Sequence, residues 1–234
     1  MTAPHDGRIA PPGNGEWLIS HAVLAFGTGV LASVAAYLLV QRGGVTVFES
    51  FAVVGAAQSL ATIGVIAWLG RGAGRPSLRP RPAWSDAGYL LLGAALALAV
   101  SWLTYLVVVQ VFGGEIPAQA VVQIADEAEG RPAMVAVVVV AVLLAPLAEE
   151  LVFRGALLRA LGRRLSVGPA ALVSAAAFAL AHLVLDFQSA VAVPALFVVG
   201  LVLAVVVQRR GRLAPAVAAH MGFNLVGVLG LLIG

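Results

Sequence analysis

Seven long apolar stretches dominate the sequence, and their length is the strongest constraint on how the chain can fold. They cover residues 17–40, 45–69, 87–112, 132–148, 168–185, 190–207 and 213–233. A helix needs about 20 apolar residues to cross the ~30 Å hydrocarbon core of a bilayer, and each stretch roughly meets that length. Hydrophobic residues make up 61% of the chain and charged residues only 11%, more apolar surface than a soluble domain can bury. The sequence therefore predicts an all-α, polytopic membrane helical bundle with about seven transmembrane helices.

Composition divides this bundle into three regions. Residues 1–16 are polar and rich in proline and glycine, which predicts a disordered cytoplasmic tail. Residues 17–131 contain the first three apolar stretches, interpreted as peripheral transmembrane helices with their loops. A polar segment at 113–131 is expected to include a short interfacial helix. Residues 132–234 hold the remaining spans and the chemical motifs described below, and are predicted to form the catalytic core.

The arginines give the predicted helices an orientation. With seven spans, the amino-terminal tail and the loops after spans two, four and six lie on the same side of the membrane. That side carries Arg8, Arg71, Arg75, Arg79, Arg81, Arg159, Arg163, Arg164, Arg209, Arg210 and Arg212, and the other side carries Arg42 and Arg131. Cytoplasmic loops are enriched in basic residues. We therefore expect a protein of the inner (plasma) membrane with a cytoplasmic amino terminus and an external carboxyl terminus.

Composition also excludes some classes of function. The chain has no cysteine, so a thiolate nucleophile, a thiolate metal ligand and a disulfide framework are all ruled out. All fourteen basic residues are arginines, and the Ala, Val, Gly and Arg bias is typical of a bacterial protein from a GC-rich genome. No basic stripe lies on a soluble domain, so nucleic acid is not expected as a partner. The oligomeric state does not follow from the sequence.

Three ionisable side chains follow the fourth apolar stretch. Glu149, Glu150 and Arg154 stand in the segment A-P-L-A-E-E-L-V-F-R, and ionisable groups at membrane depth are costly and often functional. Glu150 and Arg154 are four residues apart, which suits an ion pair along one helix face. Glu149 lies about 100° further round the helix and remains available to react. Pro146, just before the pair, is expected to kink this helix.

Two histidines and an asparagine lie at membrane depth on the last three spans. At ~1.5 Å per residue, His182 lies about 21 Å from Gly168, while His220 and Asn224 lie roughly 12 and 18 Å from Arg212. Glu149 reaches a matching depth only if its helix runs on past Arg154 to the arginines near 163. Each residue alone also fits a structural role, such as an interhelical hydrogen bond. Gln58 in the second span is interpreted in that way.

Together these residue types suit the hydrolysis of an amide bond. A buried glutamate and a histidine that share a water molecule can activate it as a nucleophile. A histidine and an asparagine offer donors to the developing oxyanion. The same residues allow a zinc alternative with Glu149, His182 and His220 as ligands, although no H-E-x-x-H motif is present. A proton-coupled transporter that uses the buried carboxylates is a further alternative, but no inverted repeat between the two halves supports it.

Three ordered motifs resemble those of the CAAX protease and bacteriocin-processing family of intramembrane endopeptidases. They are E-E-L-V-F-R at 149–154, F-A-L-A-H at 178–182 and H-M-G-F-N at 220–224, which match E-E-x-x-x-R, F-x-x-x-H and H-x-x-x-N. The resemblance implies that Glu149 and His182 activate water and that His220 and Asn224 form the oxyanion site. It gives Glu150 and Arg154 supporting roles. It also implies a membrane-associated peptide or protein substrate, no required cofactor, and eight helices as the alternative count.

Overall fold

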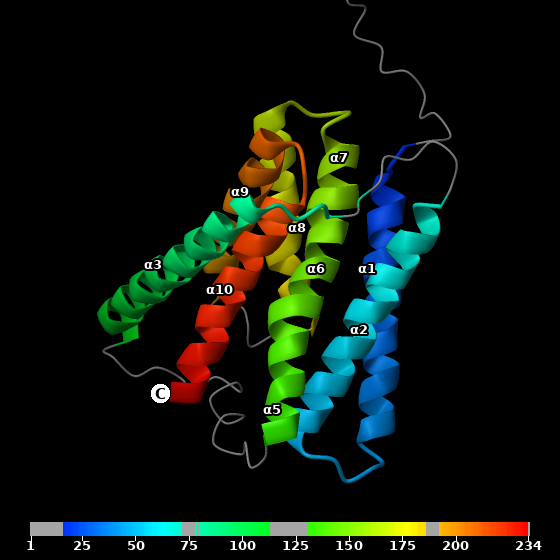
Figure 1. Cartoon of the computed structure of the whole chain (residues 1–234), viewed down its shortest axis with the longest axis vertical. Coiled ribbons are helices and arrows are strands. Elements are labelled where there is room, and N and C mark those ends of the chain that lie inside the picture. The colour runs from blue at the N-terminus through cyan, green and yellow to red at the C-terminus, as the bar shows by residue number, and fades with distance from the viewer. Residues whose placement is uncertain (1–15, 72–77, 79, 113–130, 186–191, 234) are drawn as a thin grey trace, which may run out of the picture.

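A computed structural model describes residues 16–71, 78, 80–112, 131–185 and 192–233, and all of its regular elements are helices (Figure 1). They are α1 (Ile19–Val40), α2 (Val47–Leu69), η1 (Trp84–Asp86), α3 (Ala87–Phe112), α5 (Arg131–Val138), η2 (Val139–Leu144), α6 (Ala145–Glu150), η3 (Leu151–Leu157), α7 (Leu158–Leu161), α8 (Val167–Leu185), α9 (Val193–Arg210) and α10 (Ala214–Ile233). Among the described residues, six helices are long and apolar enough to cross a membrane, and a shorter apolar helix spans Ala214–Gly230. The predicted polytopic helical bundle is confirmed. The predicted tail at 1–16, except its last residue, and the interfacial helix expected in 113–131 lie outside the described residues.

The fourth span is much longer than the apolar stretch that predicts it. Elements α5, η2, α6, η3 and α7 follow one another without a break, and 28 residues from Met134 to Leu161 qualify as one membrane span. The helix therefore runs on past Arg154, as the depth argument for Glu149 requires. At about 1.5 Å per residue, Glu149 lies roughly 18 Å from the end of the helix at Leu161.

Two segments of this long helix, η2 and η3, are π-helical rather than α-helical. The N–H of Ala145 donates to the carbonyl of Val140, and the N–H of Leu158 donates to that of Phe153, five residues back in each case. Pro146 lies at the start of α6, directly after the first of these segments. π-Helical turns are rare and frequently occur at functional sites. The kink expected at Pro146 stays a prediction, and the structure has a π-helical segment on each side of α6, which holds both glutamates.

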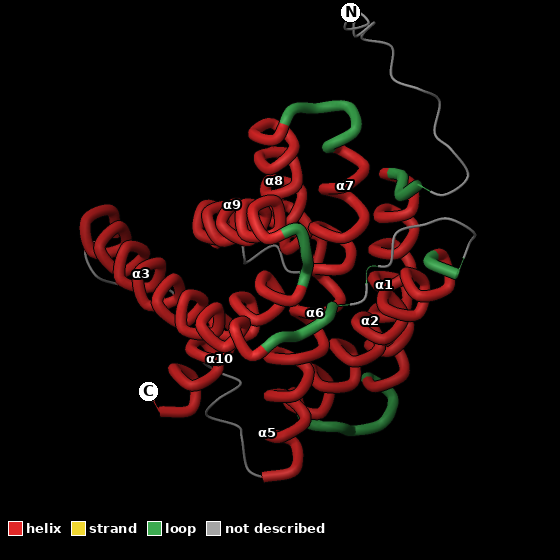
Figure 2. The backbone as a smooth tube through the Cα atoms, turned by 45° about the horizontal axis from the view of Figure 1, so that its top comes forward, coloured by secondary structure: helices red, strands yellow, loops and turns green. Residues whose placement is uncertain are grey.

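Three helix pairs pack around the long helix: α1 with α2, α3 with α10, and α8 with α9 (Figure 2). Small residues allow the closest approach in two of them. A Cβ on Gly222 of α10 would lie 2.9 Å from the Cα of Leu90 on α3 and would overlap the carbonyl of that residue. A Cβ on Gly29 of α1 would overlap the hydroxyl of Thr62 on α2. Backbones in such near contact fix the rotation of each helix about its own axis.

The arginine-rich segments gather at one end of the bundle. Figure 1 shows the end of α7 at the top and the start of α5 at the bottom. Arg163, after α7, is ion-paired with Glu16 before α1. Arg212, in the turn before α10, donates to Asp86 and to the carbonyl of Arg81. The hydrogen bond to Asp86 raises the pKa of Arg212 and keeps it charged. These contacts join segments that the predicted topology assigns to the same side of the membrane.

Candidate active site

A buried ion pair forms the base of the site. Nη1 of Arg154 lies 2.8 Å from Oε1 of Glu150, and both side chains are fully buried. Nη2 of Arg154 donates to the carbonyl of Gly200 on α9 at 3.0 Å, and the guanidinium lies 4.4 Å from the ring centre of Phe178 on α8. A buried charge needs this kind of compensation. The i,i+4 spacing predicts the ion pair, and the structure forms it.

His220 stands between the two glutamates. Its Nδ1 lies 3.0 Å from Oε1 of Glu150, and its Nε2 lies 3.6 Å from Oε2 of Glu149. A carboxylate oxygen only accepts hydrogen bonds, so Nδ1 carries a hydrogen in this contact and Nε2 faces Glu149. Glu150 thus accepts from both Arg154 and His220 and fixes the orientation of the imidazole. The side chain of Glu149 keeps 27% of its surface exposed, whereas the side chain of Glu150 has none.

His182 has a fixed ring orientation as well. Its Nδ1 lies 2.9 Å from the carbonyl of Phe178, one helical turn earlier on α8. A carbonyl oxygen only accepts, so Nδ1 is the donor and Nε2 is left with its lone pair. The ring of Phe178 contacts both imidazoles edge to face, with centroids 4.9 Å from His182 and 5.6 Å from His220. The ring of Phe178 therefore contacts both imidazoles and the guanidinium of Arg154.

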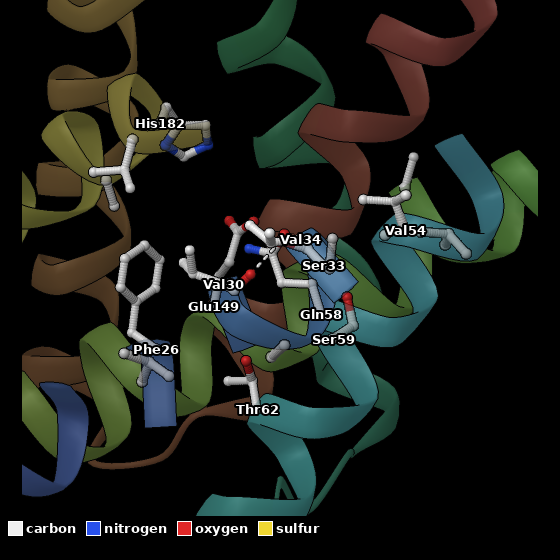
Figure 3. Close-up of a pocket in the computed structure, with 18 of the residues that line it drawn as sticks. Phe26, Val30, Ser33, Val34, Val54, Gln58, Ser59, Thr62, Glu149 and His182 are labelled. Atoms are coloured by element: carbon white, nitrogen blue, oxygen red, sulfur yellow. Dashed lines mark hydrogen bonds between the residues drawn. The ribbon is translucent and has the colours of Figure 1, made fainter. Parts of the chain in front are cut away.

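Glu149 and His182 open into one pocket of about 650 Å³, which is bounded by α1, α2, the long helix and α8 (Figure 3). Most of its lining is apolar, and five other side chains with polar groups line it: Ser33, Tyr37, Gln58, Ser59 and Thr62. His220 approaches the glutamates from α10, and neither His220 nor Asn224 is among the residues that line this pocket. The sequence predicts His182 as the nearest partner of Glu149. Of the two histidines, it is His220 whose ring lies within ion-pair distance of that carboxylate.

Asn224 contacts the backbone of the long helix. Its Nδ2 donates to the carbonyl of Ala141 at 2.8 Å. In the π-helical hydrogen bonding of η2, that carbonyl would accept from the N–H five residues later, but residue 146 is proline and has none. Asn224 thus fills the position that Pro146 leaves open. One of its two amide hydrogens is committed to this bond, and the other remains available to an oxyanion.

This arrangement predicts that Asn224 and Pro146 are energetically coupled. Replacing Asn224 by alanine leaves a carbonyl without its donor, and we expect it to cost about 1–3 kcal/mol. In a Pro146→Ala background, the backbone N–H gained by this substitution can serve the carbonyl of Ala141, so replacing Asn224 should cost less than about 0.5 kcal/mol. The measurement is unfolding in mixed micelles for the full double-mutant cycle.

A control for the cycle is Gln208→Ala, which removes an exposed amide that donates to the carbonyl of Val167 at 2.9 Å. Water can replace that bond, so the loss should be small. Equal costs of Asn224→Ala in the two backgrounds would show that Asn224 does not compensate for Pro146.

The donor geometry of the site does not provide an evident metal centre. Among the described residues, no three His, Cys, Asp or Glu side chains lie close enough together to hold a metal ion. Glu149, His182 and His220, the zinc ligands considered from the sequence, do not form such a group as they stand. The reaction proposed below uses only the side chains of the chain itself.

Some contributors to the site carry little signal in the sequence. The carbonyl of Gly200 accepts from Arg154 because a close approach to Ala175 and Phe178 brings α9 against α8. Phe178 belongs to a motif, but its position over a guanidinium depends on the packing of two helices. The free carbonyl of Ala141 is the exception, because proline at position 146 has no backbone N–H to donate to it.

The fold and the site together define a class: a multi-pass helical membrane protein with a carboxylate–imidazole cluster next to a pocket between its helices. Residues 131–226 match the family model described as Type II CAAX prenyl endopeptidase Rce1-like. The matched region contains all three motifs, and the match agrees with the resemblance that these motifs indicate. No curated protein and no solved structure matches the chain.

Proposed function

We propose that the protein is an intramembrane endopeptidase that hydrolyses a peptide bond of a membrane-associated peptide or protein, with Glu149 as the general base. One observation carries the proposal. Glu149 lies deep along the membrane-spanning helix, is partly exposed to a pocket that it shares with His182, and has Nε2 of His220 at 3.6 Å. A carboxylate in such a place is costly, and its neighbours suit proton transfer.

The proposed reaction begins with a water molecule in the pocket. Nε2 of His182 accepts a hydrogen bond from this water, and Glu149 takes one of its protons. The hydroxide attacks the carbonyl carbon of the scissile bond and gives a tetrahedral oxyanion. Glu149 then gives its proton to the leaving nitrogen, the C–N bond breaks, and the products are a carboxylic acid and an amine.

His220 and Asn224 stabilise the oxyanion in this scheme. His220 donates from Nε2 when the ring is protonated on both nitrogens, and Glu150 accepts from its Nδ1. The free amide hydrogen of Asn224 is the second donor. Donors held in place before the reaction stabilise developing charge without the cost of reorganisation. Glu150 and Arg154 act as positioning residues, because they hold His220 through a contact of 3.0 Å.

We further propose that the active site is reached from the cytoplasmic side of the plasma membrane. The arginine-rich segments joined by the Arg163–Glu16 and Arg212–Asp86 contacts lie at one end of the bundle. The positive-inside rule assigns that end to the cytoplasm. In a bacterial host, a secreted peptide or a membrane regulator is a more suitable substrate than a prenylated protein.

The test is peptide cleavage by the purified protein and its Glu149→Gln variant in detergent. The variant keeps the shape of the side chain but removes the base, so we expect kcat to fall by about 10²–10⁴-fold. The control is Glu49→Gln, an exposed glutamate that caps the start of α2, which should retain full activity. A variant Glu149→Gln as active as the wild type would overturn the assignment of the base.

The same assay with a metal chelator tests the zinc alternative. We expect the rate of cleavage to be unchanged after complete chelation, because no step of the proposed reaction uses a metal. Loss of activity on chelation, with recovery on addition of zinc, would favour the alternative in which Glu149, His182 and His220 are ligands.

A further inference from the structure

The wall of the pocket formed by α1 and α2 carries polar side chains that lie outside the residues matched to the family. Ser33 comes from α1, and Gln58, Ser59 and Thr62 come from α2. Apart from Gly55 and the hydroxyl of Tyr37, the rest of this wall is aliphatic or aromatic: Phe26, Val30, Val34, Tyr37, Phe51 and Val54. Figure 3 shows Ser33 and Gln58 around the same space as Glu149 and His182. A polar group in such surroundings requires an explanation, because hydrocarbon offers it no hydrogen bond.

Two of these side chains already have partners within the helices. The hydroxyl of Ser33 donates to the carbonyl of Val30 at 2.8 Å, and that of Thr62 approaches the carbonyl of Ala25 on α1 at 3.5 Å. The hydroxyl of Ser59 and the side-chain amide of Gln58 differ, because neither makes a hydrogen bond to any other described residue. Of these two groups, the amide of Gln58 is the larger and offers two donors as well as an acceptor. The interhelical bond expected of Gln58 from the sequence is therefore not formed. Its two donors and its acceptor remain available to a molecule in the pocket.

An extended peptide is the ligand that suits this wall. A segment that is to be cleaved must present its backbone outside a helix, and each unpaired N–H and C=O then costs several kcal/mol at membrane depth. A side-chain amide can pair with both groups of one residue, while the apolar lining receives the side chains. A lipid acyl chain offers no partner to Gln58 and would leave it unpaired. The chemistry therefore favours a peptide over a lipid.

We propose that Gln58 is a substrate-binding residue whose side-chain amide hydrogen-bonds the backbone of an extended peptide segment with apolar side chains. The segment lies in the pocket between α1, α2 and the long helix, so that its scissile carbonyl faces Glu149. This assignment rests on the proposed function, and it gives the amino-terminal helices a direct part in substrate recognition.

The test measures binding in the uncleaving Glu149→Gln protein. The probe is the best-binding member of a fluorescent library of apolar peptides, followed by anisotropy in detergent micelles. Gln58→Met keeps the length of the side chain but removes its hydrogen bonds, and we expect it to weaken binding about tenfold. Gln110→Met is the matched control, because Gln110 is exposed on α3 and does not line the pocket.

Probe peptides in which one backbone nitrogen is methylated show which residue of the peptide forms the hydrogen bond with Gln58. One methylated position should lower affinity about tenfold in the protein with Gln58 and change it little in the Gln58→Met variant. Equal binding by Gln58→Met and the control would overturn the proposal. So would equal effects of methylation in both proteins, or displacement of every peptide by lipid alone.

Cleavage by the protein with Glu149 intact separates this proposal from the proposed function. Peptides that bind through Gln58 but are never cut would contradict the proposed endopeptidase activity and still support the proposed binding site. Peptides that are cut equally well by the wild type and Gln58→Met would support the endopeptidase activity and contradict the proposed role of Gln58 in binding.

Discussion

Replacing Arg154 by alanine is expected to destabilise the protein by about 3–5 kcal/mol, because the change leaves the carboxylate of Glu150 buried without its counter-charge. Arg154 and Glu150 are both fully buried, and the guanidinium also contacts the carbonyl of Gly200 and the ring of Phe178. The measurement is unfolding in mixed micelles, together with the rate of peptide cleavage.

Two further variants separate the charge from the packing. Arg154→Lys keeps the charge but loses the fork that reaches Glu150 and Gly200 together, so an intermediate loss is expected. Arg154→Met combined with Glu150→Gln removes both charges, and should be more stable than Arg154→Ala alone. Its activity should nevertheless stay low, because Glu150 no longer orients His220 as a carboxylate.

Arg209→Ala serves as the control for loss of an arginine, since Arg209 is exposed at the end of α9. It should change stability by less than about 0.5 kcal/mol. If Arg154→Ala unfolded no more easily than Arg209→Ala, the ion pair would not be the structural base of the site.

The second large effect is expected from Gly222→Ala. The added Cβ would meet the backbone of Leu90, at 2.9 Å from its Cα and closer still to its carbonyl. Backbone atoms cannot move aside as a side chain does, so α3 and α10 must separate. We expect about 1–3 kcal/mol of destabilisation, with a larger loss of activity because His220 and Asn224 flank this glycine. The measurements are again unfolding in mixed micelles and the rate of cleavage.

Gly227→Ala is a matched control on the same helix. Nothing lies within 4 Å of the position of its added Cβ. Alanine is favoured over glycine within a helix by about 0.5–1 kcal/mol, so this variant should be as stable as the wild type or slightly more. Similar behaviour of the two alanine variants would mean that the α3–α10 contact does not set the position of the motif.

Several features of the protein follow from local rules and could be predicted from the sequence. The apolar stretches match the observed helices to within a few residues at most ends, because bilayer thickness dictates the length of a spanning helix. The Glu150–Arg154 pair follows from its i,i+4 spacing, which a single helix satisfies wherever it lies. The fourth span is the exception, since its apolar stretch ends near Ala148 while the helix continues to Leu161.

The sequence by itself thus determined a helical membrane bundle and the ion pair, and it supplied the candidate site residues Glu149, His182, His220 and Asn224 as a prediction. The tertiary structure decided whether the helix of Glu149 could continue past a buried arginine, because the carbonyl of Gly200 and the ring of Phe178 come from other helices. It also decided that His220 lies 3.6 Å from Glu149 and that Asn224 donates to the carbonyl of Ala141.

These contacts depend on how far each helix is rotated about its axis. That rotation is set by close contacts between distant glycines and backbones, such as Gly222 with Leu90, which no local pattern encodes.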